Sequence, residues 1–325
     1  MRKPFLLFMI GAIAIASCGE NPPDSPDKPN VVTTSTMITD WTKQVGGDEI
    51  EVIGILEPGA DPHVYEPVPA DNRAIAQADL VLYNGYNLEP ELIKVINGTG
   101  ISEEKRLAVA EVVTPFAYEY DGQSVPDPHV WGDAENAIAM VKAIRDRLIE
   151  LSPEDETEFT ENAAQYIEEL ERLDDWIAEQ IQTIPPDQRK LVTTHDAFQY
   201  YARAYGLDVT GTLIGISTEE QPSAQTVKNL SDAVKQSNVP AIFAETTINP
   251  ALIKTVAKEA GVKLAEQELY SDSIGAPDSD ANSYIGMLAV NTRTIVKALE
   301  GNYSPFPQTR SNQSLVLCSP LSKGG

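Results

Sequence analysis

Three histidines are the residues of this chain whose type and placement most clearly indicate chemistry. His63 follows a β-rich run, His129 precedes the helical pattern 134–149, and His195 comes directly after the β-rich run 191–194. Such strand-to-helix connections line the ligand crevice of open α/β sheets. A single histidine is more often a hydrogen-bonded structural residue, but that interpretation would have to hold three times at equivalent positions. We therefore expect the three imidazoles to converge on one point.

Three imidazoles and one carboxylate would form a closed site for Zn²⁺ or a related divalent ion. Asp272 is the favoured fourth ligand, because it follows the last strand of the second half of the chain as a histidine follows its first. Glu245, which follows another strand, is the competing candidate. Asp133, Asp196 and Glu66 are candidates for carboxylates that orient the imidazoles without binding the metal.

The composition indicates a large folded protein that does not bind nucleic acid. A chain of 325 residues exceeds one core of ordinary size, and its 42% hydrophobic residues are enough for two. Lys and Arg number 24 against 49 Asp and Glu, which gives a formal net charge of −25. Such a surface repels phosphate backbones.

Alternating strand and helix patterns predict an α/β fold with two βα lobes, at 31–151 and 186–301. The β-rich runs of the first lobe are 31–36, 51–56, 80–84 and 106–109, and those of the second are 191–194, 209–214, 241–244 and 262–265. Helical patterns such as 70–78, 224–236 and 250–260 separate these runs.

The segment 152–185 predicts one long amphipathic helix that joins the lobes. Apolar residues recur at three- and four-residue steps from Phe159 to Ile184. Ser152 is placed to cap the helix, and Asp155 completes a capping-box pattern. A continuous helix of this length would run along both lobes as a rigid connector, so we expect only small movements of the lobes.

The N-terminus predicts export and lipid attachment. Residues 1–17 contain a basic start and the apolar run 5–16, which is too short to span a bilayer but suits a signal peptide. Cys18 follows small residues as in a bacterial lipobox, and the proline-rich stretch 18–30 is typical of a tether. Acylation of Cys18 would leave Cys318 as the one remaining cysteine, so no intramolecular disulfide is expected.

The C-terminal segment 302–325 differs in character from the rest of the chain. It contains no acidic residue and is rich in Ser, Pro and Gln, so we expect a disordered tail.

Four motifs resemble the metal-binding, solute-binding lipoproteins of bacterial ABC importers for zinc and manganese, the ZnuA/TroA-like cluster A-I family. The resemblance covers about residues 31 to 300. The motifs are GADPHVYEP at 59–67, DPHVW at 127–131, THDAFQYY at 194–201 and LYSDS at 269–273.

The resemblance implies a metal site in the cleft between the lobes, with His63, His129, His195 and Asp272 as ligands. It implies that one Zn²⁺ or Mn²⁺ per chain is carried as cargo to a membrane permease and its ATPase. The protein would be a monomer without enzymatic activity, held by its lipid in the periplasm or on the outer face of the cytoplasmic membrane. In this family, Glu at the position of His195 is usually associated with manganese, whereas His occurs there in zinc binders and in members that handle both metals. This chain nevertheless lacks the His-rich loop of many zinc members.

Two other functions compete with metal transport. A surface adhesin or interaction lipoprotein would also be tethered and acidic. A zinc-dependent hydrolase needs an open coordination position for water, and the sequence contains no His-Glu-x-x-His pair. Metal capture is preferred because it accounts for all three histidines.

Overall fold

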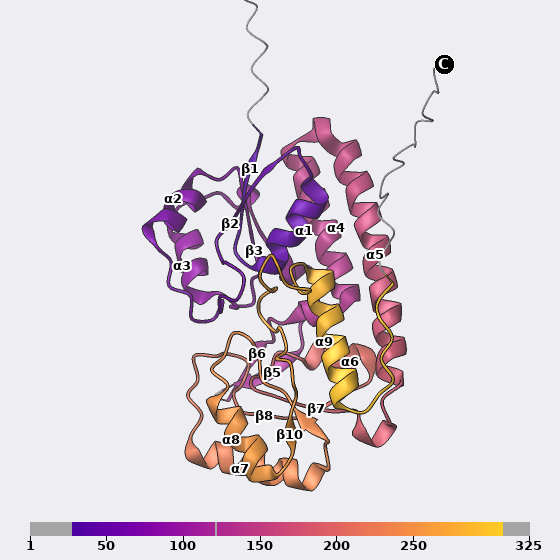
Figure 1. The fold of residues 1–325 in the computed structure, drawn as a ribbon. Helices are drawn as coiled ribbons and strands as arrows, with labels where there is room; N and C mark the ends of the chain where they lie inside the picture. The colour runs from indigo at the N-terminus through magenta and orange to yellow at the C-terminus, as the bar shows by residue number, and fades with distance from the viewer. Residues whose placement is uncertain (1–27, 121, 308–325) are drawn as a thin grey trace, which may run out of the picture.

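A computed structural model describes residues 28–120 and 122–307 (Figure 1). The predicted signal peptide 1–17, Cys18 and most of the 18–30 tether lie outside these residues. The described chain forms two βα lobes beside one long helix, which confirms the predicted fold class. In the described part of the chain, no helix is long and apolar enough to cross a membrane.

The first lobe is built on a parallel sheet in the order β2-β1-β3-β4. The strands are β1 Asn30–Thr33, β2 Glu51–Gly54, β3 Leu80–Tyr83 and β4 Arg106–Ala108. The helices are α1 Thr36–Gly46, α2 Pro69–Gln77, α3 Pro90–Gly98 and α4 Ala134–Leu151, with 3₁₀ turns η1 Glu103–Lys105, η2 Val109–Val112 and η3 Val130–Gly132. An antiparallel hairpin of β5 Ala117–Tyr120 and β6 Gln123–Pro126 precedes η3.

Strand β1 ends before the predicted run 31–36 does, because helix α1 begins at Thr36, inside that run. The Ser35 hydroxyl accepts a hydrogen bond from the Ile38 N–H, 3.3 Å away, and so caps α1. This helix was not among those predicted.

The second lobe repeats the pattern with four parallel strands. They are β7 Lys190–Thr193, β8 Asp208–Thr212, β9 Ala241–Ile242 and β10 Lys263–Leu264. β8 pairs with β7 and β10 pairs with β9, and the Phe243 N–H donates to the Val192 carbonyl at 2.9 Å, which places β9 beside β7. The helices are α6 Gln199–Tyr205, α7 Ala224–Ser237 and α8 Ala251–Ala260, and the 3₁₀ turn η5 Pro186–Gln188 leads into β7.

The long helix is α5, Glu156–Gln182, which Figure 1 shows running beside both lobes. Its 27 residues make it about 40 Å long. The predicted start differs, because residues Pro153–Asp155 form a separate 3₁₀ turn, η4. The Ser152 hydroxyl donates to the Asp155 carboxylate at 2.6 Å instead of accepting a backbone N–H, so Ser152 does not cap the helix.

One apolar core passes through both lobes. Val31 of β1, Leu170 of α5 and Leu191 of β7 belong to the same cluster, which also includes helix α9, Tyr284–Ala298. The opposite faces of the two sheets form separate clusters, one under α2 and α3 around Val32 and one under α7 and α8 around Val192. Each sheet therefore has helices on both faces, and the inner layer is shared.

The prediction of a disordered tail over 302–325 is wrong for its first six residues. The Trp176 Nε1–H donates to the Ser304 carbonyl at 3.1 Å, and the Ser304 N–H donates to Gln180 Oε1 at 2.7 Å. The rings of Tyr303 and Phe306 pack edge-on against Trp176. Isolated aromatic residues that dock on a helix leave no periodic pattern in the sequence. Residues 308–325 lie outside the described chain.

Candidate metal centre

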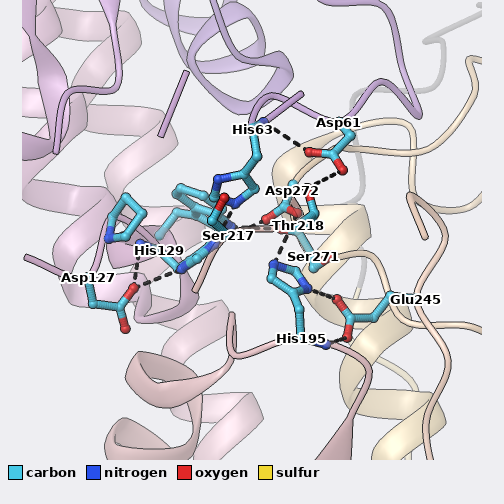
Figure 2. A network of polar contacts seen from close by, with 12 residues as sticks. Asp61, His63, Asp127, His129, His195, Ser217, Thr218, Glu245, Ser271 and Asp272 are labelled. Atoms are coloured by element: carbon cyan, nitrogen blue, oxygen red, sulfur yellow. Dashed lines mark hydrogen bonds and ion pairs between the residues drawn. The ribbon is translucent and has the colours of Figure 1, made fainter. Parts of the chain in front are cut away.

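The four predicted ligands lie together between the lobes (Figure 2). His63, His129, His195 and Asp272 each offer one ligand atom, and these atoms all lie within 4.8 Å of one another. Each of the four side chains is almost completely buried. Within the described chain, this is the one group of His, Cys, Asp and Glu side chains whose geometry could hold a metal ion.

Both lobes contribute to the cluster through loops that leave strands. His63 lies between β2 and α2, and His129 between β6 and η3. His195 comes two residues after the end of β7, and Asp272 lies between β10 and α9. The four loops bring together residues that are far apart in the sequence, and His63 and Asp272 are 209 positions apart.

The distances within the cluster suit tetrahedral coordination. His63 Nε2 lies 3.2 Å from His129 Nε2, and the carboxylate of Asp272 lies 3.5 Å from His129 Nε2 and 3.2 Å from His195 Nε2. Zn–N and Zn–O bonds of about 2.0–2.2 Å place tetrahedral ligands about 3.4 Å apart. These three pairs are therefore already close to the tetrahedral spacing, and the ligand atoms of the whole cluster lie within 4.8 Å of one another.

Several atoms of the cluster lack a hydrogen-bond partner among the described residues. They are Nε2 of His195 and both carboxylate oxygens of Asp272, all deeply buried. A buried polar atom without a partner is costly to fold unless a ligand satisfies it. A divalent cation bound by His195 Nε2 and the Asp272 carboxylate would supply the missing partner.

Asp127 orients His129 from behind. Its Oδ1 accepts hydrogen bonds from the His129 backbone N–H at 3.0 Å and from Nδ1 at 2.8 Å, which leaves Nε2 facing the cluster. The sequence Asp-Pro-His allows this contact because Asp accepts readily from the N–H two residues later. Asp61-Pro62-His63 forms the same turn, and there Asp61 Oδ1 accepts from the His63 N–H at 2.9 Å. The repeated motif was visible in the sequence, but these roles were not predicted.

Glu245 supports His195 instead of joining the ligand atoms. One of its oxygens accepts from the His195 backbone N–H at 2.8 Å, and the other contacts Nδ1. Nε2 is left to face Asp272. The geometry therefore places Asp272, and not the competing Glu245, among the ligand atoms.

The other carboxylates considered from the sequence do not contact the imidazoles. Asp196 is buried, but its side chain accepts from Gln199. Asp133 caps α4 by accepting from the Glu135 N–H. Glu66 is exposed. Asp127 and Glu245 carry out the orienting role proposed for these three residues.

Trp131 joins the loops that carry two of the ligands. Its indole N–H donates to the Ser271 carbonyl at 3.0 Å, next to Asp272, while its ring packs edge-on against His129 at 5.3 Å. The Trp131 carbonyl accepts from the Tyr284 hydroxyl at 2.6 Å, which ties the pair to α9.

Burial and neighbouring charges act differently on the pKa values of the side chains in the cluster. Burial lowers the pKa of His63 to about 3, so this imidazole is neutral and its lone pair is free at physiological pH. Burial opposes charge on His195, but Glu245 and Asp272 outweigh it and raise the pKa of His195 above its usual range. Burial likewise acts to raise the pKa of Asp272, but the charge of His195 dominates and lowers it. Asp272 is therefore an anion ready to bind metal.

Replacing Glu245 by Gln should weaken metal binding about 10- to 100-fold, the usual effect of removing a carboxylate that orients a ligand. The amide has one acceptor for two donors, the His195 N–H and Nδ1. The measurement is a competition titration against a chelator. Glu266→Gln, at an exposed position of the same lobe, is the control. Unchanged affinity in Glu245→Gln would show that Glu245 does not orient His195.

The fold and the site define a class: a two-lobed protein with a buried metal centre whose ligands come from both lobes. The family described as ZnuA, "Zinc-uptake complex component A periplasmic", matches residues 31–298. The chain belongs to this family, whose members are binding proteins for transport and not enzymes.

Among the similar proteins, some are named as manganese-binding and others as zinc-binding. The chain is 34% identical over 304 residues to the manganese-binding lipoprotein MntA of Halalkalibacterium halodurans, covering 92% of this chain and 99% of the relative. It is 37% identical over 278 residues to the zinc-binding protein TroA of Treponema pallidum, covering 84% and 89%.

Solved structures agree with the fold. The periplasmic zinc-binding protein TroA of Treponema pallidum superimposes with a TM-score of 0.79 at 35% identity, over 84% of this chain and 99% of that one. A Mn-bound periplasmic metal-binding protein from Candidatus Liberibacter asiaticus gives a TM-score of 0.75 at 27% identity, over 84% and 100%.

Proposed function

We propose that this protein captures one divalent transition metal ion, Zn²⁺ or Mn²⁺, outside the cytoplasm and delivers it to the permease of an ABC importer. The observation that carries the proposal is the buried cluster of His63, His129, His195 and Asp272, with unpartnered ligand atoms, in a member of the ZnuA family. The ion is cargo, and the protein performs no chemistry on it.

Delivery requires a location at the membrane and a transport partner. Cys18, which lies outside the described residues, is the lipid attachment point, and the permease with its ATPase receives the ion. The relatives named as ABC transporter substrate-binding lipoproteins support both parts of this proposal. The ligand cluster is complete within one chain, which supports a monomer as the functional unit.

Metal analysis tests the proposed function directly. Protein purified without chelators should contain one Zn²⁺ or Mn²⁺ per chain, and metal-free protein should bind one equivalent of either ion. A deletion strain should fail to grow under metal starvation while attachment is unaffected. Protein that binds neither ion would contradict metal capture, and loss of attachment alone would support the adhesin.

The donor set favours zinc at equilibrium. Affinities of nitrogen and oxygen sites rise from Mn²⁺ towards Cu²⁺, and imidazole suits Zn²⁺ well. Mn²⁺ is retained as a candidate cargo because metal availability outside the cytoplasm can override this preference. Competition between the two ions for the purified protein measures the intrinsic preference.

Metal affinity should fall about tenfold for each pH unit between pH 7.5 and 5.5, or about 100-fold in total. A metal must displace the proton from His195, whose pKa in the metal-free protein is raised, so each lower pH unit strengthens the competition. His63, with a pKa of about 3, adds no competing proton in this range. Titrations in non-chelating buffers measure the slope. A flat profile would show that metal binding does not displace a proton from His195.

A further inference from the structure

The segment that carries His63 is fastened to the second lobe by side-chain hydrogen bonds. The Gly59 N–H donates to the Ser273 hydroxyl at 2.7 Å. Closer to the site, the Thr218 hydroxyl donates to Asp61 Oδ2 at 2.6 Å (Figure 2). The other oxygen of the same carboxylate accepts from the His63 N–H. One carboxylate therefore connects the backbone of His63 to a residue of the opposite lobe.

Thr218 lies in the loop between β8 and α7. The first residues of this loop, 213–215, are hydrogen-bonded to the neighbours of His195 in the chain. The Leu213 N–H donates to the Thr194 carbonyl at 3.0 Å, and the Asp196 N–H donates to the Gly215 carbonyl at 3.2 Å. The start of the loop is thus held by the residues before and after His195. The side chain of Thr218, further along the loop, contacts Asp61 of the first lobe. This loop bridges the ligand segments of the two lobes.

Residues of the same loop line a cavity that also borders His63. The cavity has a volume of about 440 Å³, and its lining includes Ile216, Ser217 and Glu219 of the loop and Tyr86 of the first lobe. Six waters occupy about 180 Å³ of liquid, so the space admits a hydrated ion.

We propose that Thr218 is a positioning residue whose hydrogen bond to Asp61 holds His63 on the metal and so sets the rate of metal release. The inference rests on the proposed function. For His63 to move away with its segment, the bond between Thr218 and Asp61 must break, because Asp61 is attached to the backbone of His63. The contact between Gly59 and Ser273 limits that movement to the part of the segment nearest the ligand.

Replacing Thr218 by Val tests the proposal, since Val keeps the branched shape and lacks the hydroxyl. The rate of metal release, measured by stopped-flow transfer to an excess of chelator, should rise about tenfold, the effect of losing a hydrogen bond to a half-buried carboxylate. The association rate should change little. Thr218→Ser, which keeps the hydroxyl, should release metal at close to the wild-type rate. Thr210→Val is the matched control, because the hydroxyl of Thr210 donates to a carbonyl within its own strand.

A double-variant cycle separates this role from general loosening of the fold. In an Asp61→Ala background, Thr218→Val should have no further effect on release, because the bond is already absent. Additive effects, an unchanged release rate in Thr218→Val, or equally fast release from Thr218→Ser would overturn the proposal. If the wild-type protein binds no metal, the proposed function itself fails. If the wild-type protein binds metal but Thr218→Val releases it at the wild-type rate, the proposed function stands and only the role of Thr218 is rejected.

Discussion

Replacing Asp272 by Asn should lower metal affinity about a thousandfold while the protein stays folded. Asp272 is the single anionic ligand of the cluster, and its oxygens face the Nε2 atoms of His129 and His195. Without that charge, a divalent ion in a buried site would be surrounded by neutral donors. Removing one partner of a buried charge pair costs about 3–5 kcal/mol, and each 1.4 kcal/mol is tenfold in affinity. Competition titration with a chelator measures the loss.

Asp196→Asn is the matched control for this prediction. Asp196 is also a buried acid and is adjacent to His195 in sequence, but its carboxylate accepts from Gln199 and not from an imidazole. Its replacement should leave affinity within a few-fold of wild type. Circular dichroism of both metal-free variants checks the fold. Wild-type affinity in Asp272→Asn would show that the fourth ligand is another residue.

Exchanging His195 for Glu should lower the ratio of Zn²⁺ to Mn²⁺ affinity at least about tenfold. The substitution replaces a nitrogen donor by a harder oxygen donor, which favours Mn²⁺ relative to Zn²⁺. The single variant would place two carboxylates side by side, because Glu245 contacts His195 directly and both are completely buried. Such a pair resists ionisation. The informative protein is therefore the double variant His195→Glu/Glu245→Gln.

Glu245→Gln alone is the reference for the double variant, because it shares the loss of the supporting carboxylate and retains the imidazole. The quantity to compare is the affinity ratio from direct competition between the two ions, since absolute affinity for both should fall. A ratio that is unchanged or higher than in Glu245→Gln would mean that His195 does not contact the metal.

The convergence of the histidines could be predicted because it follows from topology. Loops at the carboxyl ends of parallel strands line the ligand crevice of a sheet, so the placement of His63 and His195 after strands indicated that each would face the crevice of its own lobe. Asp272 was favoured as the fourth ligand because it comes after the last strand, and the structure places it in the cluster with the three histidines. The long helix was visible in the spacing of its apolar residues, although its first turn departs into the 3₁₀ geometry of η4.

The contacts that support the ligands could not be predicted from spacing. Glu245 lies 50 positions from His195, and Thr218 lies 157 positions from Asp61. Such pairs depend on the relative placement of two loops, each irregular and without a hydrophobic period. Glu245 was identified from the sequence as the competing fourth ligand because it follows a strand, but its hydrogen bonds to His195 are visible only in the structure.

The apolar layer shared by the lobes makes the chain indivisible as a folding unit. Helices α1 and α4 of the first lobe pack against α5, and α5 packs against α6 and α9 of the second. A fragment that ends near residue 151 would expose the buried faces of α1 and α4 to water, at about 25 cal/mol for each Å² of apolar surface. Each lobe is thus half of one cooperative structure, and a metal bound between the lobes stabilises the whole molecule against unfolding.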